Sequence, residues 1–146
     1  KLMDTEKTSP IIIGVTGHRA IREQDRPALT VAVKAELEKL RGLCPHSPLV
    51  MLSSLAEGAD LLCADAAEEL GIPLIAVLPR ERTDYEQDFS PEALERFAHH
   101  CERAVQVFVS PSTEPLPPDG VSRTYQFRQA GIYVAAHCHI LLALWD

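Results

Sequence analysis

Two loops of this sequence combine glycine with charged side chains, a combination suited to binding phosphate. The first follows three consecutive isoleucines, in the run Ile-Ile-Ile-Gly-Val-Thr-Gly-His-Arg. Two glycines let the backbone turn sharply and approach a ligand, and the histidine and arginine supply charge to a phosphate or carboxylate. The pattern lacks the Gly-Lys-Ser/Thr ending of a P-loop, and a tight turn with a solvated arginine is the alternative. The candidate ligand-binding residues here are Gly14, Thr16, Gly17, His18 and Arg19.

The second loop reads Ser-Ser-Leu-Ala-Glu-Gly-Ala-Asp. Ser53 and Ser54 offer hydroxyl groups, and Gly58 stands where the next helix is expected to begin. Free N–H groups and the dipole at a helix N-terminus favour an anion. Glu57 can receive a ribose hydroxyl or act as a general base, whereas Asp60 is better explained as helix capping. Ordinary first-turn carboxylates are the alternative for both.

Three aromatic residues are further candidates for the same pocket. Tyr85, with Asp88 nearby, can line its far side, although loops of this kind are usually just polar. Tyr125 and Arg128 lie one helical turn apart and can face the mouth, or form a half-buried aromatic beside a surface charge. A base or sugar can stack on Trp145, which is equally compatible with a place in the core.

The histidines and cysteines do not predict a metal site. His99 and His100 are adjacent on an expected helix and so should point to different faces, and no His-x-x-x-His or clustered Cys/His pattern exists. There is no Gly-x-Ser-x-Gly elbow, and no cysteine lies in a cationic loop, so no nucleophile stands out. We therefore assign no catalytic residue unless Glu57 serves an enzyme, and we expect no cofactor.

The elements that position these residues alternate between strand and helix. Strands are expected over 10–16, 49–52, 73–78, 105–109 and 139–145, and helices over 26–41, 59–70, 91–101 and 122–137. Such alternation predicts an α/β protein with a three-layer, Rossmann-like, doubly wound parallel sheet. Right-handed crossovers give the strand order 3-2-1-4-5, with two helices on each face and a switch point between strands 1 and 4. Gly131 within the last helix predicts a close helix–sheet approach, and the proline-rich 110–120 a stiff loop or lid.

Composition limits the class of protein. The 146 residues are 46% hydrophobic and carry a net charge of -7, which predicts one domain and, without a Lys/Arg cluster, no nucleic-acid partner. No apolar run reaches the ~20 residues of a membrane span. Four scattered cysteines are typical of free thiols in a cytoplasmic protein. We expect residues 1–9 to be disordered or an expression remnant, and 10–146 to be a single domain that is cut short at its C-terminus.

Five motifs together resemble one family across nearly the whole chain. They are Ile-Gly-Val-Thr-Gly-His-Arg, Leu-Ala-Glu-Gly-Ala-Asp, Val-Leu-Pro, Asp-Tyr-x-x-Asp-Phe and Leu-Leu-Ala-Leu-Trp-Asp. The set is similar to the SLOG group of bacterial Rossmann-like proteins, relatives of the "lonely guy" phosphoribohydrolases and of the DNA-processing protein A fold. The resemblance implies a nucleotide-derived ligand, and many members are ligand-sensing modules attached to an effector domain. It assigns to the pocket Gly17, His18, Arg19, Ser54, Glu57, Gly58 and Asp60.

Three functions remain open at this point. The first is binding or sensing of a nucleotide-like small molecule. A homodimer and an effector domain are further partners to consider for it, and we expect no membrane partner. The second is a nucleotide hydrolase in which Glu57 is the acid/base and Arg19 holds phosphate. The Pro-Gly-Gly-x-Gly-Thr loop of the phosphoribohydrolases is missing, which counts against this second function. The third is a structural module with vestigial loops.

Overall fold

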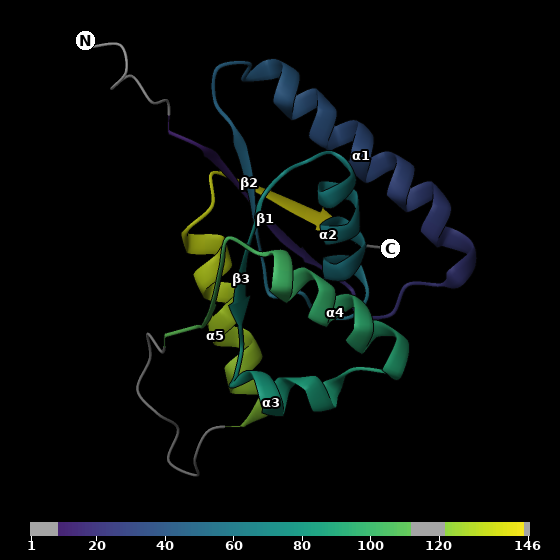
Figure 1. Cartoon of the computed structure of the whole chain (residues 1–146), viewed down its shortest axis with the longest axis vertical. Coiled ribbons are helices and arrows are strands. Elements are labelled where there is room, and N and C mark those ends of the chain that lie inside the picture. Colours follow the sequence, from purple (N-terminus) through teal and green to yellow (C-terminus); the bar gives the residue numbers. More distant parts are fainter. Residues whose placement is uncertain (1–8, 112–121, 145–146) are drawn as a thin grey trace.

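Five parallel strands form the centre of the computed structural model, which describes residues 9–111 and 122–144 (Figure 1). The strands are β1 (Ile11–Gly17), β2 (Leu49–Ser53), β3 (Leu74–Leu78), β4 (Gln106–Val109) and β5 (Ile140–Leu144). Every neighbouring pair is parallel. This confirms the predicted α/β, three-layer, Rossmann-like fold. The expectations for residues 1–8, for most of the proline-rich loop and for Trp145 lie outside the described residues.

Five helices are described, and the last two of them begin at serine side-chain caps. The five are α1 (Arg26–Leu43), α2 (Ala59–Glu69), α3 (Arg82–Tyr85), α4 (Pro91–Arg103) and α5 (Arg123–Ala136), with short 3-10 turns at Glu23–Asp25 and Glu86–Asp88. The Ser90 side chain accepts a hydrogen bond from the Ala93 N–H at the start of α4. Ser122 accepts one in the same way from Tyr125 at the start of α5. These side-chain caps satisfy backbone donors that a helix otherwise leaves unpaired.

The predicted strand order is wrong for the last two strands. The sheet runs β4-β3-β2-β1-β5, so β4 extends the row beyond β3 and β5 lies beside β1. Helical and strand periodicity show where elements occur but not in which direction the chain steps along a sheet. Strands β2, β3 and β4 are each added beside the preceding strand in the same direction, and β5 is then placed on the other side of β1. The switch point therefore lies between β1 and β5 and not between β1 and β4.

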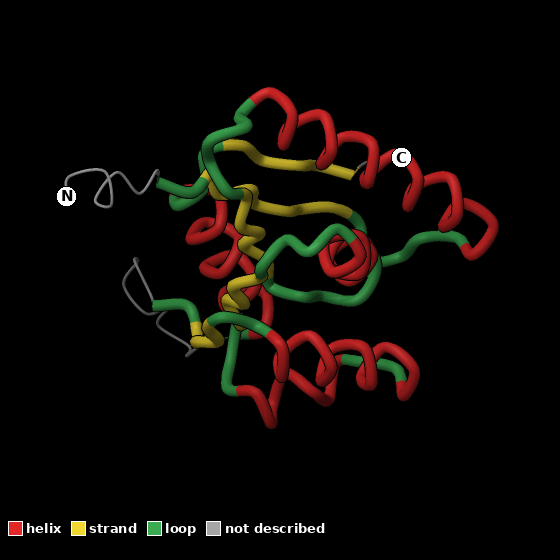
Figure 2. The backbone as a smooth tube through the Cα atoms, turned by 45° about the horizontal axis from the view of Figure 1, so that its top comes forward, coloured by secondary structure: helices red, strands yellow, loops and turns green. Residues whose placement is uncertain are grey.

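This order also decides which face each helix covers. Right-handed crossovers that step in one direction leave their helices on one face, and the returning crossover leaves its helix on the other. Accordingly, among the described residues, α1, α2 and α4 share one face and α5 is the helix on the opposite face (Figure 1; Figure 2). The expectation of two helices on each face is therefore wrong.

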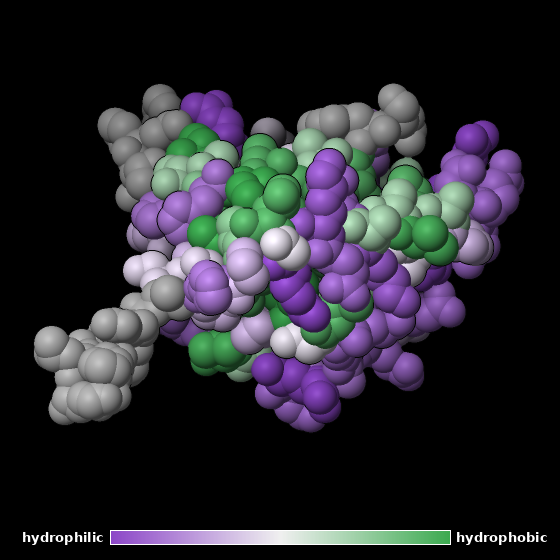
Figure 3. All heavy atoms as spheres, turned by 90° about the horizontal axis from the view of Figure 1, so that it is seen from above, coloured by the Kyte–Doolittle hydropathy of each residue, from purple (hydrophilic) through white to green (hydrophobic). Residues whose placement is uncertain are grey.

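The main core lies between the sheet and the three-helix face. Fully buried side chains there include Ile13, Leu37, Met51, Leu61 and Phe97. A smaller cluster lies under α5 around Leu52, Val77 and Val134. In the part of the chain that the structure describes, the apolar side chains of Val107 in β4 and Leu141 in β5 are exposed. The view from above shows apolar residues at the surface among polar ones on that side of the molecule (Figure 3). No helix of the described ranges is long and apolar enough to cross a membrane.

Candidate functional site

The two predicted loops are joined by backbone contacts. The Ala59 N–H donates to the His18 carbonyl at 2.9 Å. Gly58 has a φ of +95°, and a Cβ placed on it would lie 2.2 Å from the Arg19 carbonyl oxygen. A Cβ on Gly17 would lie 2.6 Å from the Ala59 Cβ. Glycine is therefore required at both positions by the approach of the loops to each other.

A cleft of about 360 Å³ opens beside these loops, between the end of β1, the start of α2 and one face of α5. The predicted site residues that line it are Thr16, Gly17, Arg19, Ser54, Glu57 and Asp60. The remaining lining residues are mostly apolar: Val15, Ala56, Phe127, Gly131, Val134, Ala135 and Leu141. The carboxyl ends of parallel strands near a switch point are the usual place for a ligand in this class of fold.

The sequence pointed to Tyr125 and Arg128 of this helix at the mouth of the pocket, but it missed the apolar residues of α5 that line the cleft, because Phe127 and Val134 belong to a helical stripe that is typical of a core. Gly131 was the residue in the sequence that could have indicated this part of the cleft wall. A Cβ at Gly131 would meet nothing within 4 Å, so the close helix–sheet approach predicted there is wrong. The close approach occurs at Gly14, where a Cβ would lie 2.9 Å from both the Cys138 Sγ and a Val134 methyl carbon. Gly14 is thus placed under α5, whereas Gly131 leaves space in the cleft wall.

Arg19 is the one lysine or arginine among the described residues that line this cleft. Its Nη2 donates to the Asp88 carbonyl oxygen at 3.1 Å, and its Cζ lies 5.6 Å from the centre of the Phe127 ring. A carbonyl and an aromatic face each favour the cationic group, so they restrict where an otherwise exposed guanidinium lies. The remaining N–H groups of Arg19 can donate to a bound anion.

Asp60 places a buried carboxyl group at the same cleft. Its side chain belongs to the first turn of α2, the residue is 7% exposed, and Oδ2 accepts a hydrogen bond from the Ala56 N–H at 3.1 Å. Burial raises the pKa of Asp60 to about 7, against the opposing effects of that hydrogen bond and of the Arg19 charge. A carboxyl group with this pKa exchanges a proton near neutral pH and can act as donor or acceptor.

Glu57 and Ser53 already have partners within the chain. The Glu57 carboxylate accepts from the Ser90 N–H at 3.2 Å and from the Ser90 hydroxyl at 3.0 Å, which links the second loop to the start of α4. Ser53 is fully buried, and its Oγ accepts from the Leu55 N–H at 3.0 Å. The Ser53 side chain therefore stabilises a local turn and does not line the cleft.

Tyr85 lies behind the cleft wall. It is fully buried, and its hydroxyl donates to the Ser54 carbonyl at 3.0 Å. Its ring makes edge contacts with Phe89, Phe97 and Phe127 at centroid distances of 4.9, 5.4 and 5.8 Å. The structure thus gives Tyr85 a place in the aromatic core, supporting the loop that carries Ser54.

Replacing Tyr85 with phenylalanine is expected to lower the free energy of unfolding by about 1 kcal/mol, because the ring stays and one buried hydrogen bond is lost. Urea unfolding measures this change. Phe89→Tyr serves as a comparison that adds a hydroxyl to the same cluster. A Tyr85→Phe protein as stable as wild type would contradict the hydrogen bond to Ser54.

The Asp88 side chain holds the surrounding loops together. It is 1% exposed and forms ion pairs with Arg80, at 3.8 Å, and with Arg123 at the start of α5. The Asp88 side chain therefore joins the loop after β3 to α5, while the Asp88 backbone carbonyl accepts a hydrogen bond from Arg19. Neither partner arginine was singled out from the sequence, because Arg80 lies 8 and Arg123 35 residues from Asp88, and nothing local in the sequence pairs them.

Two further candidates lie outside the lining of this cleft. His18 is exposed on the first loop, where its backbone carbonyl holds Ala59. Tyr125 is half-buried in the first turn of α5. Both come from the elements that border the cleft, but neither lines it. Gly58 lines instead a smaller hollow of about 230 Å³ beside Arg26 and Glu92.

Comparison with known proteins identifies the fold. No family model matches the chain, and no curated protein sequence does. DNA processing protein A from Streptococcus pneumoniae superposes with a TM-score of 0.61 and 22% identity, over 92% of this chain and 41% of that one. DNA processing protein A from Helicobacter pylori, described for its single-stranded DNA binding mode, superposes with a TM-score of 0.59 and 16% identity, over 94% of this chain and 55% of that one. The chain thus spans about half the length of these proteins.

This likeness corrects the exclusion of nucleic acid as a partner. That exclusion rested on the net charge of -7. A protein with the same fold is described as binding single-stranded DNA, so the argument from charge is wrong. Net charge averages over the whole surface, whereas phosphate contacts depend on the local placement of a few cations. The structural neighbours of this chain are DNA processing protein A molecules, whose Rossmann-like fold it shares.

Proposed function

We propose that this chain is a SLOG-type module that binds a phosphorylated nucleoside in the cleft at the ends of β1 and β2. The observation that carries the proposal is the placement of Arg19 between the Asp88 carbonyl and the Phe127 ring, in the same cleft as the Asp60 carboxyl group. A cleft of about 360 Å³ is within the range of small-molecule sites. The four cysteines are free, in keeping with a cytoplasmic protein.

The lining residues divide into a polar and an apolar part. Arg19 donates to the phosphate, and the dipole of α2 adds positive potential near its first turn. The helix offers few donors of its own, because its Ala59 and Leu61 N–H groups bind the carbonyls of His18 and Ala56. Asp60 and Ser54 are suited to hydroxyl groups of a sugar. Phe127 offers an apolar surface to a base.

We favour binding or sensing over hydrolysis of the ligand. A general base must be free to reach the proton that it removes. The two carboxylate oxygens of Glu57 both accept hydrogen bonds from Ser90, and this engagement supports a structural role for Glu57. Glu57→Gln is therefore expected to leave ligand affinity within a few-fold of wild type. Turnover of a nucleoside monophosphate by the wild type, lost in Glu57→Gln, would favour the hydrolase instead.

Arg19→Gln is expected to abolish ligand-induced stabilisation. We would screen nucleoside mono- and diphosphates, cyclic nucleotides, NAD and ADP-ribose by thermal shift. A ligand at about 100 times its Kd adds roughly 2.7 kcal/mol of stability, which for a domain of this size raises Tm by several degrees. Arg22→Gln is the matched control, since Arg22 is exposed and pairs with Asp25, three residues away, at 2.9 Å. A flat screen, or equal loss in both variants, would contradict the proposal.

A second candidate is single-stranded DNA, favoured by the likeness to the Helicobacter pylori protein. Fluorescence anisotropy with a labelled oligo(dT) at low and high salt tests it, because each phosphate contact steepens the salt dependence. If the strand occupies the same cleft, Arg19→Gln weakens binding and a mononucleotide competes. Binding that Arg19→Gln and mononucleotides leave unchanged would place DNA on another surface. No binding at low salt would remove this candidate.

A further inference from the structure

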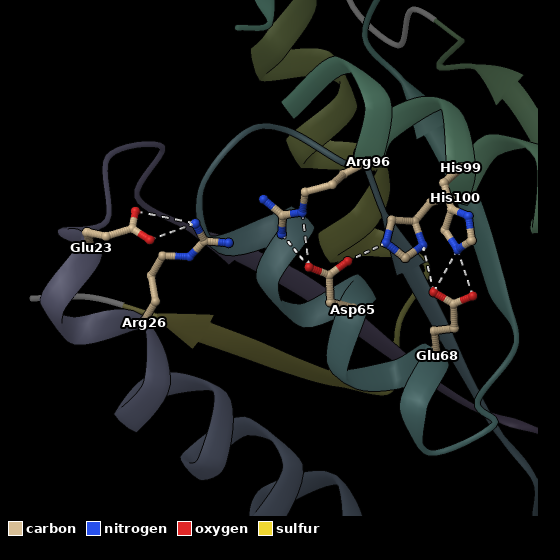
Figure 4. A network of polar contacts seen from close by, with 7 residues as sticks. All are labelled: Glu23, Arg26, Asp65, Glu68, Arg96, His99 and His100. Carbon is tan, nitrogen blue, oxygen red and sulfur yellow. Dashed lines mark hydrogen bonds and ion pairs between the residues drawn. The ribbon is translucent and has the colours of Figure 1, made fainter. Parts of the chain in front are cut away.

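A second group of polar side chains lies between the C-terminal halves of α2 and α4 (Figure 4). The Glu68 carboxylate faces both His99 and His100. The His99 Nε2 lies 2.9 and 2.7 Å from the two carboxylate oxygens, and the His100 Nδ1 lies 4.0 Å from Oε1. These adjacent histidines differ in exposure, with side chains 49% and 4% exposed, but a carboxylate from the neighbouring helix lies where both rings can approach it.

Asp65 determines which nitrogen of His100 is available. Asp65 Oδ1 lies 2.6 Å from the His100 Nε2, and its other oxygen accepts from the Arg96 Nε at 3.1 Å. A carboxylate oxygen only accepts hydrogen bonds, so the His100 Nε2 carries the proton in its contact with Asp65. The other ring nitrogen of His100, Nδ1, faces Glu68 and lies 4.0 Å from its Oε1.

We propose that Glu68, His99 and His100 bind a divalent transition-metal ion such as Zn²⁺, with Asp65 as the residue that positions His100. Two imidazoles and one carboxylate form a known zinc ligand set. A carboxylate that accepts the second N–H of a ligating histidine is the usual outer-shell arrangement, and it makes the ligand more basic.

The geometry requires only small movements. One ligand atom from each of the three residues lies within 4.8 Å of the other two. Metal–ligand bonds of about 2.0–2.1 Å at tetrahedral angles place ligand atoms roughly 3.4 Å apart. The observed separations from the Glu68 Oε1, 2.9 Å to the His99 Nε2 and 4.0 Å to the His100 Nδ1, lie on either side of this value. The side chains of Glu68 and His99 are 35% and 49% exposed, so both have room to adjust.

The surroundings favour a cation with an open coordination position. The C-terminal ends of α2 and α4 carry the negative ends of their dipoles. A hollow of about 200 Å³, lined in part by Glu68, His100 and Arg103, adjoins the cluster and can admit a water or a small anion. The Arg103 Nε lies 2.8 Å from the Glu68 Oε2 and competes for that oxygen. Arg103 is 65% exposed, so a metal ion can displace it.

Metal titration of the untagged chain, first treated with a chelator, tests the site. We expect one Zn²⁺ per chain by calorimetry at pH 7.5, and Co²⁺ to give the intense visible absorption of a tetrahedral site. His99→Ala and Glu68→Gln each remove one ligand, and we expect at least tenfold weaker binding. Asp65→Asn keeps an acceptor for His100 but removes its charge, which should weaken binding about 10- to 100-fold.

His46→Ala is the matched control, because His46 is an exposed histidine in the loop before β2. It is expected to bind metal like the wild type. His99 and Glu68 are partly exposed, so circular dichroism should show folded variants. Absence of saturable binding in the wild type, or unchanged affinity in Glu68→Gln, would overturn the proposal and leave the cluster as an ion-pair network between the helices. The result does not depend on nucleotide binding at the cleft.

Discussion

Replacing Gly58 with alanine is expected to lower the free energy of unfolding by about 3 kcal/mol or more. Two costs add. Its φ of +95° is unfavourable for any residue with a Cβ, which typically costs about 1–3 kcal/mol. The added Cβ would also lie 2.2 Å from the Arg19 carbonyl oxygen and 2.5 Å from that of His18, so one of the two loops must move. Urea unfolding of both proteins measures the difference.

Substitutions at two other glycines distinguish the cost of the positive φ from the cost of the steric clash. Gly71 has a φ of +71°, but a Cβ there would meet nothing within 4 Å, so Gly71→Ala is expected to cost only about 1–2 kcal/mol. Gly42 lies in α1 with open space around it, and Gly42→Ala is expected to stabilise the protein by about 0.5–1 kcal/mol. If Gly58→Ala costs no more than Gly71→Ala, the two loops do not approach each other as described.

Asp60→Asn is expected to stabilise the protein increasingly as the pH rises from about 4 to about 7. In the unfolded chain this carboxyl group loses its proton near pH 3.8, whereas burial raises its pKa in the folded protein to about 7. Over that window the unfolded state binds fewer protons, so the Asp60 contribution to stability falls as the pH rises. The difference of about three units between the two pKa values corresponds to roughly 4 kcal/mol of unfolding free energy, and this loss of stability stays constant above pH 7.

Urea unfolding of the wild type and Asp60→Asn from pH 4.5 to 8.5 measures this effect as a widening gap in stability. Asparagine keeps an oxygen that can accept from the Ala56 N–H, so the hydrogen bond at 3.1 Å is preserved. Asp25→Asn is the control, since Asp25 lies at a solvent-exposed turn and pairs with Arg22. A gap between wild type and Asp60→Asn that stays the same at pH 5 and pH 8 would show that Asp60 is ionised throughout.

Most of the local structure could be predicted from the sequence. The expected strand at 10–16 and helix at 59–70 match β1 (Ile11–Gly17) and α2 (Ala59–Glu69) within one residue. Apolar periodicity, first-turn prolines and serine caps act over a few residues, so they can be recognised without knowing the rest of the chain. The meeting of the two glycine loops was also predictable, because parallel strands end at one edge of the sheet.

The use of individual site residues was not predictable in the same way. Glu57 has the right type and place for a catalytic carboxylate, but Ser90, 33 residues away, occupies both of its oxygens. Tyr85 is in a polar loop, yet its hydroxyl binds a carbonyl 31 residues away and its ring is fully buried. His99 and His100 of α4 both approach the carboxylate of Glu68, which belongs to α2. Each outcome depends on a partner that the neighbouring sequence does not specify.

The sequence by itself determined the α/β class, the element positions and the glycine loops at the ends of β1 and β2. The tertiary structure alone decided the strand order, the placement of α5 on the face opposite α1, α2 and α4, and the partners of the polar residues. The physical reason is the range of the interactions. Helix caps, turns and amphipathic periods depend on residues a few positions apart. The direction of each crossover and the pairing of buried polar groups depend on which distant segments pack together.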